Sequence, residues 1–290
     1  MTNAFNTPNE LAGSGDIRVI GDRACGKTTY LAALAYWPNH DSALSPIQSI
    51  TPFDADTGGL CDMAENILKK GGHLPPSDNP DDPDSMPLYT LLIDLKPKFS
   101  LFNQQNIRIQ VSCREYGGEL IEDLGKTITS KLESYLNDCA SASGLLIQID
   151  GRSQAKDEQY AKAFKTLETE LSDRLKKNNQ NPNNQKIAIV FTKGEQAPIW
   201  NERNKLPDYI NRKFPQTRIA LQSWMTKWGC SMDYFICSAF GVMGNPPRPN
   251  VTGGNNGVIA RPQYWKPFGL VTPLYWLYAG KYDSRLNDIP

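Results

Sequence analysis

The residues best suited to chemistry lie near the start of the chain, in the segment Gly21-Asp22-Arg23-Ala24-Cys25-Gly26-Lys27-Thr28. A glycine, four residues, and then Gly-Lys-Thr is the pattern of a phosphate-binding loop. Its glycines let the backbone approach a phosphate, and the N–H groups at the start of the next helix face the anion. Lys27 would add a positive charge at the outer phosphates, and the Thr28 hydroxyl suits a Mg²⁺ ligand. We expect this segment, together with Thr29, to bind a nucleotide.

The surroundings of the segment support this interpretation. An apolar strand is predicted at Ile17–Ile20 and a helix at Lys27–Trp37, as a phosphate loop requires. A glycine-rich turn without a ligand is the alternative. Arg23 lies inside the loop, where three roles are open. It could neutralise charge in a transition state, bind phosphate in the ground state, or extend into solvent.

Further along the chain, predicted strands alternate with predicted helices. Three continuous apolar runs read as buried strands, at Gly144–Ile149, Lys186–Phe191 and Met232–Ile236. Leu88–Leu95 and Ile107–Ser112 read as an antiparallel pair. The alternation predicts an α/β fold with a mostly parallel central sheet and helices on both faces. A ligand is then expected at the carboxyl ends of the strands.

The remaining segments complete the predicted organisation. Helical spacing covers Glu119–Cys139, Gln154–Lys177, Leu206–Lys227 and Phe268–Tyr278. We expect a flexible arm at residues 1–15, one domain at 16–280 and a tail at 281–290. Within the domain, residues 38–87 form a long insertion without regular periodicity, with a short helix at 63–70 and an exposed loop at 75–87.

Polar loops follow two of the predicted strands. Thr192-Lys193-Gly194-Glu195 comes after Lys186–Phe191, and Ser238-Ala239 comes after Met232–Ile236. With the phosphate loop, these segments resemble the Ras-like, translation-factor class (TRAFAC) of P-loop GTPases. The fourth motif of that class is Asn/Thr-Lys-x-Asp, and its fifth is Ser-Ala-Lys/Leu. The resemblance implies a P-loop NTPase G domain that binds GTP or GDP with Mg²⁺.

The resemblance also implies roles for the loop residues. The Lys193 stem would stack on the base, and Glu195 would accept from the guanine N1–H and exocyclic amine. The Ala239 N–H would donate to the guanine O6, with Thr192 and Ser238 completing the two loops. Glu195 is one methylene longer than the Asp of the class.

The third motif departs from the pattern of the class, which has Asp-x-x-Gly. Matching its glycine to Gly117 puts Arg114 at the Asp position, whereas matching it to Gly118 puts Glu115 there. Gly118 or Glu119 then falls where Ras-like proteins carry the Gln that orients the attacking water. Either Glu115 replaces the metal-binding carboxylate or Mg²⁺ is held weakly. The two glycines could contact the γ-phosphate as a mobile switch, or form an ordinary turn.

The first switch is expected within residues 38–87. The class needs one threonine there to close on Mg²⁺, and both Thr51 and Thr57 are candidates, of which we favour Thr51. A long segment of this kind, a divergent third motif and an aromatic helix near the C-terminus also resemble bacterial GTPase-like modules. Such modules are found next to partner genes in multi-component systems, so the resemblance implies a protein partner.

Composition narrows the classes of partner. The chain has 290 residues with 31 basic and 31 acidic side chains, so no net field favours nucleic acid. Six scattered cysteines without a CxxC pair, and the absence of a secretory signal, predict reduced thiols in a cytoplasmic protein. No apolar run is long enough to span a bilayer, so we expect no integral membrane association.

Three functions remain open from the sequence. The first is a slow GTPase that acts as a nucleotide-dependent switch for a protein effector or regulator. The second is a nucleotide-binding scaffold that no longer hydrolyses the nucleotide. The altered third motif supports this hypothesis. The third is an ATP-dependent P-loop enzyme. In that case the match of the two base-reading loops to the fourth and fifth motifs would be a coincidence.

Overall fold

A seven-stranded sheet forms the centre of the computed structural model, which describes residues 13–36, 45–70, 86–96, 107–115, 117–126, 128–252 and 257–290. The strand order is β2-β3-β4-β1-β5-β6-β7. Their bounds are β1 Gly13–Gly21, β2 Ile47–Pro52, β3 Leu88–Leu95, β4 Ile107–Glu115, β5 Gly144–Asp150, β6 Lys186–Thr192 and β7 Ser231–Ile236. Neighbouring strands from β4 to β7 pair in parallel, while β2 and β3 each run antiparallel to the next.

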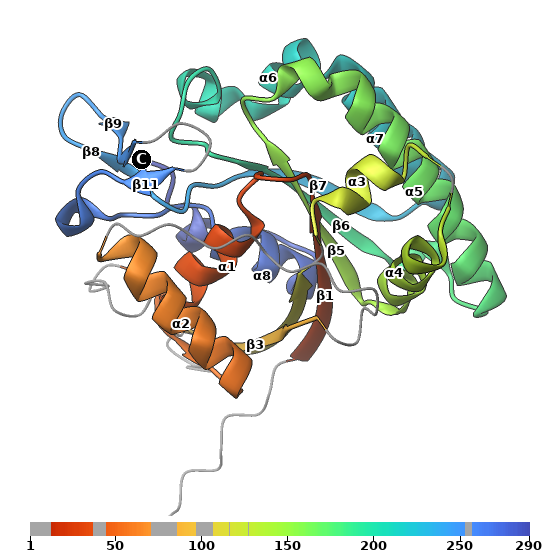
Figure 1. The fold of residues 1–290 in the computed structure, drawn as a ribbon, viewed down its shortest axis with the longest axis horizontal. Coiled ribbons are helices and arrows are strands. Elements are labelled where there is room, and N and C mark those ends of the chain that lie inside the picture. The colour runs from red at the N-terminus through yellow and green to blue at the C-terminus, as the bar shows by residue number, and fades with distance from the viewer. Residues whose placement is uncertain are drawn as a thin grey trace, which may run out of the picture.

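Helices cover both faces of the sheet (Figure 1). Helices α1 (Lys27–Tyr36), α2 (Ala55–Leu68) and α8 (Val271–Ala279) contribute to one buried apolar cluster. The opposite cluster draws on α3 Glu119–Asp123, α4 Ser130–Ser141, α5 Asp157–Lys177, α6 Leu206–Lys213 and α7 Pro215–Trp228. A mostly parallel sheet between two helical layers confirms the predicted fold of a P-loop G domain.

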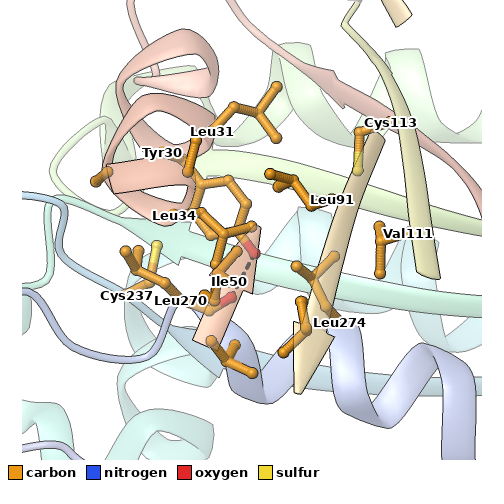
Figure 2. Close-up of a cluster of buried hydrophobic side chains, with 14 of the residues drawn as sticks. Tyr30, Leu31, Leu34, Ile50, Leu91, Val111, Cys113, Cys237, Leu270 and Leu274 are labelled. Atoms are coloured by element: carbon orange, nitrogen blue, oxygen red, sulfur yellow. Dashed lines mark hydrogen bonds between the residues drawn. The ribbon is translucent and has the colours of Figure 1, made fainter. Parts of the chain in front are cut away.

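Helix α1 packs on one face of the sheet through its buried apolar side chains. Tyr30, Leu31 and Leu34 are buried and face β2, β3 and β4 in Figure 2. The Tyr30 hydroxyl donates to the Leu270 carbonyl oxygen at 2.6 Å, which satisfies the polar end of a buried ring. The helix that begins at the phosphate loop is thus held on the α8 side of the sheet.

The segment between α1 and β3 is more regular than the sequence suggests. The expectation that residues 38–87 are largely irregular was wrong, because β2 and α2 lie within them. The helix expected at 63–70 is present, but it begins earlier, at Ala55, and ends at Leu68. Asp54 caps α2 by accepting from the Thr57 N–H at 2.8 Å, and its other oxygen accepts from the Thr90 N–H at 3.1 Å. Most of the predicted loop at 75–87 lies outside the described residues.

Other differences concern boundaries. The helix expected at Glu119–Cys139 is two helices, because the Thr129 side chain accepts from the Leu132 N–H and starts α4. The helix-rich stretch expected at Leu206–Lys227 is formed by α6 and α7, and Pro215 begins α7. Two small ribbons follow β7, formed by β8 Val242–Met243 with β9 Arg248–Pro249, and β10 Val251–Thr252 with β11 Val258–Ile259. Short 3₁₀ turns cover Gln154–Lys156, Pro182–Asn184, Ile199–Lys205, Pro262–Tyr264 and Ser284–Leu286.

Both ends of the described chain pack on the domain. Strand β1 starts at Gly13, inside the segment expected to be an arm. Leu286 is buried in the predicted tail, and its carbonyl accepts from the Thr272 hydroxyl at 2.8 Å. Within the described ranges, no helix has both the length and the apolar character needed to cross a bilayer.

Helix α7 receives its N-terminal cap from another helix. The Asp157 carboxylate of α5 accepts from the backbone N–H groups of Gln216 at 3.0 Å and Thr217 at 2.9 Å. Removing this cap leaves two donors of the first turn unmet.

We therefore expect Asp157→Ala to lower the free energy of unfolding by about 1–2 kcal/mol. Asp173→Ala is the matched control, because Asp173 is an exposed residue of the same helix. Denaturant titration of both variants measures the difference. Equal stability of the two variants would contradict the capping role.

Candidate functional site

The phosphate loop joins β1 to α1 at the carboxyl edge of the sheet. Ala24 and Gly26 adopt positive φ values of 58° and 101°. The Lys27 ammonium folds back onto the loop and donates to the carbonyl oxygens of Gly21 and Asp22, each at 3.1 Å. Lys27 is only 6% exposed. A buried cation whose contacts are two neutral carbonyls is well placed to attract an anion into the loop.

Asp22 braces the loop from behind. Its carboxylate accepts from the Arg23 N–H at 2.7 Å and the Tyr160 hydroxyl at 3.2 Å, and it forms an ion pair with Lys156. Asp22 is 2% exposed, so its side chain is committed to the protein. Only its backbone remains available for the predicted phosphate contact.

Cys25 lies inside the phosphate loop, whereas Thr28 and Thr29 lie just after it, at the start of α1. Burial raises the pKa of the Cys25 thiol, so this side chain is neutral near pH 7 and packs under the loop. Thr28 and Thr29 lie in the first turn of α1 and are half-buried. Their place at the helix start keeps them as candidates for Mg²⁺ and phosphate.

The loop after β6 is bonded directly to the phosphate loop. The Thr192 hydroxyl donates to the Cys25 carbonyl oxygen at 2.6 Å. The Lys193 ammonium donates to the Ala24 carbonyl oxygen at 2.7 Å, and both residues have positive φ, at 57° and 58°. Non-glycine residues keep such strained backbone only where the surroundings hold it. The structure therefore brings the predicted base-reading loop and the predicted phosphate loop together.

Glu195 is the most unusual group of the site. It is 1% exposed, and its Oε1 accepts from the Gln196 side-chain amide at 3.0 Å. Its Oε2 is buried and makes no hydrogen bond to any of the described residues. Burial raises the pKa of the carboxyl, against the lowering effect of side-chain hydrogen bonds with Ser238 and Gln196. A buried acceptor left without a donor is costly unless a ligand supplies one.

The loop after β7 lies beside Glu195. The Gly194 N–H donates to the Cys237 carbonyl oxygen at 2.9 Å, which joins the two loops. The Ser238 hydroxyl accepts from the Gly241 N–H at 2.7 Å, and half-buried Ala239 follows it. The Ser238 side chain therefore serves both its own turn and Glu195. Ala239 keeps the position predicted for a backbone contact to the base.

The glycine end of the third motif lies against the phosphate loop. A Cβ on Gly118 would overlap the backbone nitrogen and Cα of Arg23, so only glycine fits there. The Arg23 guanidinium forms an ion pair with Glu119. Burial acts to raise the pKa of Glu119, but its own N–H and Arg23 hold that pKa below its usual value. Arg23 thus points toward the third motif, although two thirds of its side chain is exposed.

The two alignments of the third motif place different residues near the site. Arg114 contacts Asp138 of α4 at 3.3 Å, so its side chain turns to the helical layer. The backbone of Glu115 pairs with Val19 at the end of β1, while its side chain lies outside the description. Gly117 is buried next to Gly118. Glu115 therefore remains a prediction as the metal carboxylate.

The candidate threonines of the first switch lie away from the loop. Thr51 is in β2, and two strands separate β2 from β1, or about 14 Å at the usual strand spacing. Thr57 is buried, and its hydroxyl donates to Asp54 at 2.6 Å within the α2 cap. The structure does not bring either threonine to the phosphate loop.

Several residues of the site were missed by sequence reasoning. Lys156 and Tyr160 support Asp22, while Asp150, Arg152 and Gln196 support the base-reading loop. Asp150 carried a usable signal, because it is the polar residue that ends the apolar strand β5.

Comparisons with known proteins find similarity to solved structures only. No protein-family model and no curated protein matches the sequence. A septin GTPase domain from Chlamydomonas reinhardtii superposes with a TM-score of 0.39 at 12% identity, covering 92% of this chain and 91% of that one. The GTP-bound Ski7 GTPase-like domain of S. cerevisiae gives 0.35 at 12% identity, with 93% and 51% covered.

Elongation factor SelB from Methanococcus maripaludis, in complex with a GTP analogue, gives a TM-score of 0.33 at 12% identity. The match covers 78% of this chain but only 30% of SelB, so the chain spans less than a third of that factor. These similarities are low. We base the G-domain fold on the sheet and phosphate loop of the chain itself.

The buried carboxylate of Glu195 predicts a cost in stability. Because folding raises its pKa, the folded protein holds the proton more tightly than the unfolded chain does. The free energy of unfolding therefore falls as the pH rises through this pKa, and the ionised group is destabilising at neutral pH.

We expect Glu195→Gln to raise the Tm of the nucleotide-free protein at pH 7.5 by roughly 2 °C or more, with a smaller gain at pH 4.5. Glu158→Gln is the control, since Glu158 is exposed on α5. Scanning calorimetry at both pH values checks the sign. A lower Tm for Glu195→Gln at pH 7.5 would mean that the carboxylate is stabilising as it stands.

Proposed function

We propose that this protein binds guanine nucleotides and acts as a slow, nucleotide-dependent switch for a partner protein. The observation that carries the proposal is the buried, unsatisfied Oε2 of Glu195, on a loop bonded to the phosphate loop. Guanine presents N1–H and an exocyclic amine as adjacent donors, whereas adenine has an acceptor at N1. A buried carboxylate therefore favours guanine over adenine.

The other residues fit the rest of a nucleotide. Lys27 and the backbone N–H groups of the loop would hold the phosphates, and the Lys193 stem would lie against the base. Thr28 would ligate Mg²⁺, which usually keeps several waters and needs few protein ligands beside phosphates. In the described parts of the chain no group of three or more His, Cys, Asp or Glu side chains is placed to hold a metal. The phosphates of the nucleotide and bound waters would therefore supply most of the Mg²⁺ ligands.

The contact between the third motif and the phosphate loop supports the switch. Gly118 lies on Arg23, and Glu119 pairs with the same arginine. A γ-phosphate near Arg23 would compete with Glu119 for the guanidinium and displace the segment from Gly117 onward. A protein effector would then read the position of that segment.

The second candidate is a scaffold that binds nucleotide without hydrolysing it. The third motif favours it, because the alignment that puts Arg114 at the Asp position has no metal carboxylate there. The Arg114 side chain pairs with Asp138 instead. Hydrolysis separates the two functions, whereas nucleotide binding is common to both.

The binding function is tested with GDP and ADP. We expect calorimetric titration of the wild type to show at least about tenfold tighter binding of GDP, or about 1.4 kcal/mol. Lys27→Ala should weaken GDP binding by more than this factor while the fold is kept. Lys162→Ala, which removes an exposed lysine of α5, is the control. Equal affinity for GDP and ADP would favour the hypothesis of an ATP-dependent enzyme. Unchanged GDP affinity of Lys27→Ala would contradict the phosphate-binding role of the loop.

The rate of hydrolysis tests the switch. No Gln lies at the water-orienting position and the usual third-motif Asp is absent, so transition-state stabilisation is weak while the phosphates are still held. We expect single-turnover GTP hydrolysis of about 10⁻⁴–10⁻³ s⁻¹ or below.

If Arg23 moves from Glu119 to the γ-phosphate, Arg23→Ala should lower this rate at least about tenfold with little change in GDP affinity. Arg212→Ala is the matched control, because Arg212 forms a similar exposed ion pair with Glu202. A parallel loss of rate and GDP affinity would assign Arg23 to ground-state binding. Turnover near one per second without a partner would contradict a slow switch.

A further inference from the structure

Asp150 lies behind both base-reading side chains. Its carboxylate ends β5 and is 10% exposed. Oδ2 accepts from the Lys193 ammonium at 2.8 Å, and the Arg152 guanidinium grips both oxygens, at 3.1 Å and 2.9 Å. Burial acts to raise the pKa of Asp150, but Arg152 and Lys193 hold that pKa below its usual value. The group is therefore a fixed anion between two cations.

The remaining arm of Arg152 leads to Glu195 through one amide. Arg152 Nη1 donates to the Gln196 Oε1 at 2.8 Å, and the Gln196 Nε2 donates to the Glu195 Oε1 at 3.0 Å. A guanidinium can only donate and a carboxylate can only accept, so the orientation of the Gln196 amide is determined by its two neighbours. The backbone of Gln196 is also held, because its N–H donates to the Lys193 carbonyl oxygen at 3.0 Å.

This chain of bonds decides which oxygen of Glu195 faces the ligand. Because Gln196 occupies Oε1, the free acceptor is Oε2. A glutamate has one more rotatable bond than an aspartate, so it needs such a restraint to present its carboxylate in one orientation. The bond from Arg152 also polarises the amide and strengthens its donation to the carboxylate.

We propose that Asp150, Arg152 and Gln196 are the positioning residues of base recognition. Asp150 holds Lys193 directly and holds Glu195 through Arg152 and Gln196, so that one buried carboxylate orients both side chains that meet the base. The inference rests on the proposed guanine-nucleotide function and goes beyond it, because none of these three residues needs to touch the nucleotide.

Inosine nucleotides provide the probe, since the base of IDP lacks the exocyclic amine of GDP. The affinity ratio of GDP to IDP then reports how well Glu195 meets that amine, while ADP affinity reports the rest of the site. We expect Gln196→Leu to lower the GDP/IDP ratio roughly tenfold while ADP affinity stays unchanged. Calorimetric or fluorescence titration with the three nucleotides measures both.

Gln196→Glu separates positioning from simple packing. Its carboxylate can still accept from Arg152 but cannot donate to Glu195, so the ratio should fall as it does for Gln196→Leu. Gln222→Leu is the control, because Gln222 is exposed on α7. Thermal unfolding of each variant verifies that it is folded.

The outcomes are distinct. A wild type that prefers GDP to ADP and IDP, with a ratio that survives in both Gln196 variants, would overturn the positioning role alone. A ratio kept by Gln196→Glu but lost by Gln196→Leu would show that only the contact with Arg152 matters, which also overturns it. A wild type that does not discriminate GDP from ADP would overturn the proposed function together with this inference.

Discussion

Two hydrogen bonds between loops hold the candidate site together. The Thr192 hydroxyl and the Lys193 ammonium each reach a carbonyl oxygen of the phosphate loop, across the carboxyl ends of β1, β5 and β6. Because these strands are parallel and lie next to one another, their terminal loops emerge at one edge. Strand pairing brings the loop that carries Glu195 and the loop that carries Lys27 to the same edge, and these two bonds fix them against each other.

The general fold was predictable because its strands carry strong local signals. Gly144–Asp150 is buried at every position and reads as a continuous apolar run, and the phosphate loop lies where strand and helix meet. The insertion before β3 was not predictable in the same way. Ile47–Pro52 is short, and α2 carries two glycines, Gly58 and Gly59, near its start. The Asp54 side chain that caps α2 also accepts from the Thr90 N–H, and Thr90 lies far along the chain.

The site shows the same limit. Motif spacing predicted that Lys27, Lys193 and Glu195 belong together, because each follows a strand of one sheet. Spacing carries no information on the bond between Arg152 and Gln196, which are 44 positions apart and meet only because β5 and β6 pair. Likewise, the contact of Gly118 with Arg23 depends on how β4 aligns with β1. Motif spacing therefore does not predict residues whose role depends on tertiary contacts.

The central position of β1 has a consequence for synthesis on the ribosome. The strand that carries the phosphate loop is made before both of its partners, β4 and β5. At about 5–20 residues per second, β1 waits roughly 4 s to 20 s before the first residues of β4 are made. Through that interval both edges of β1 lack their partner strands, and an unpaired edge can pair with another chain. The sheet can therefore form around β1 only after Ile107–Glu115 has been made.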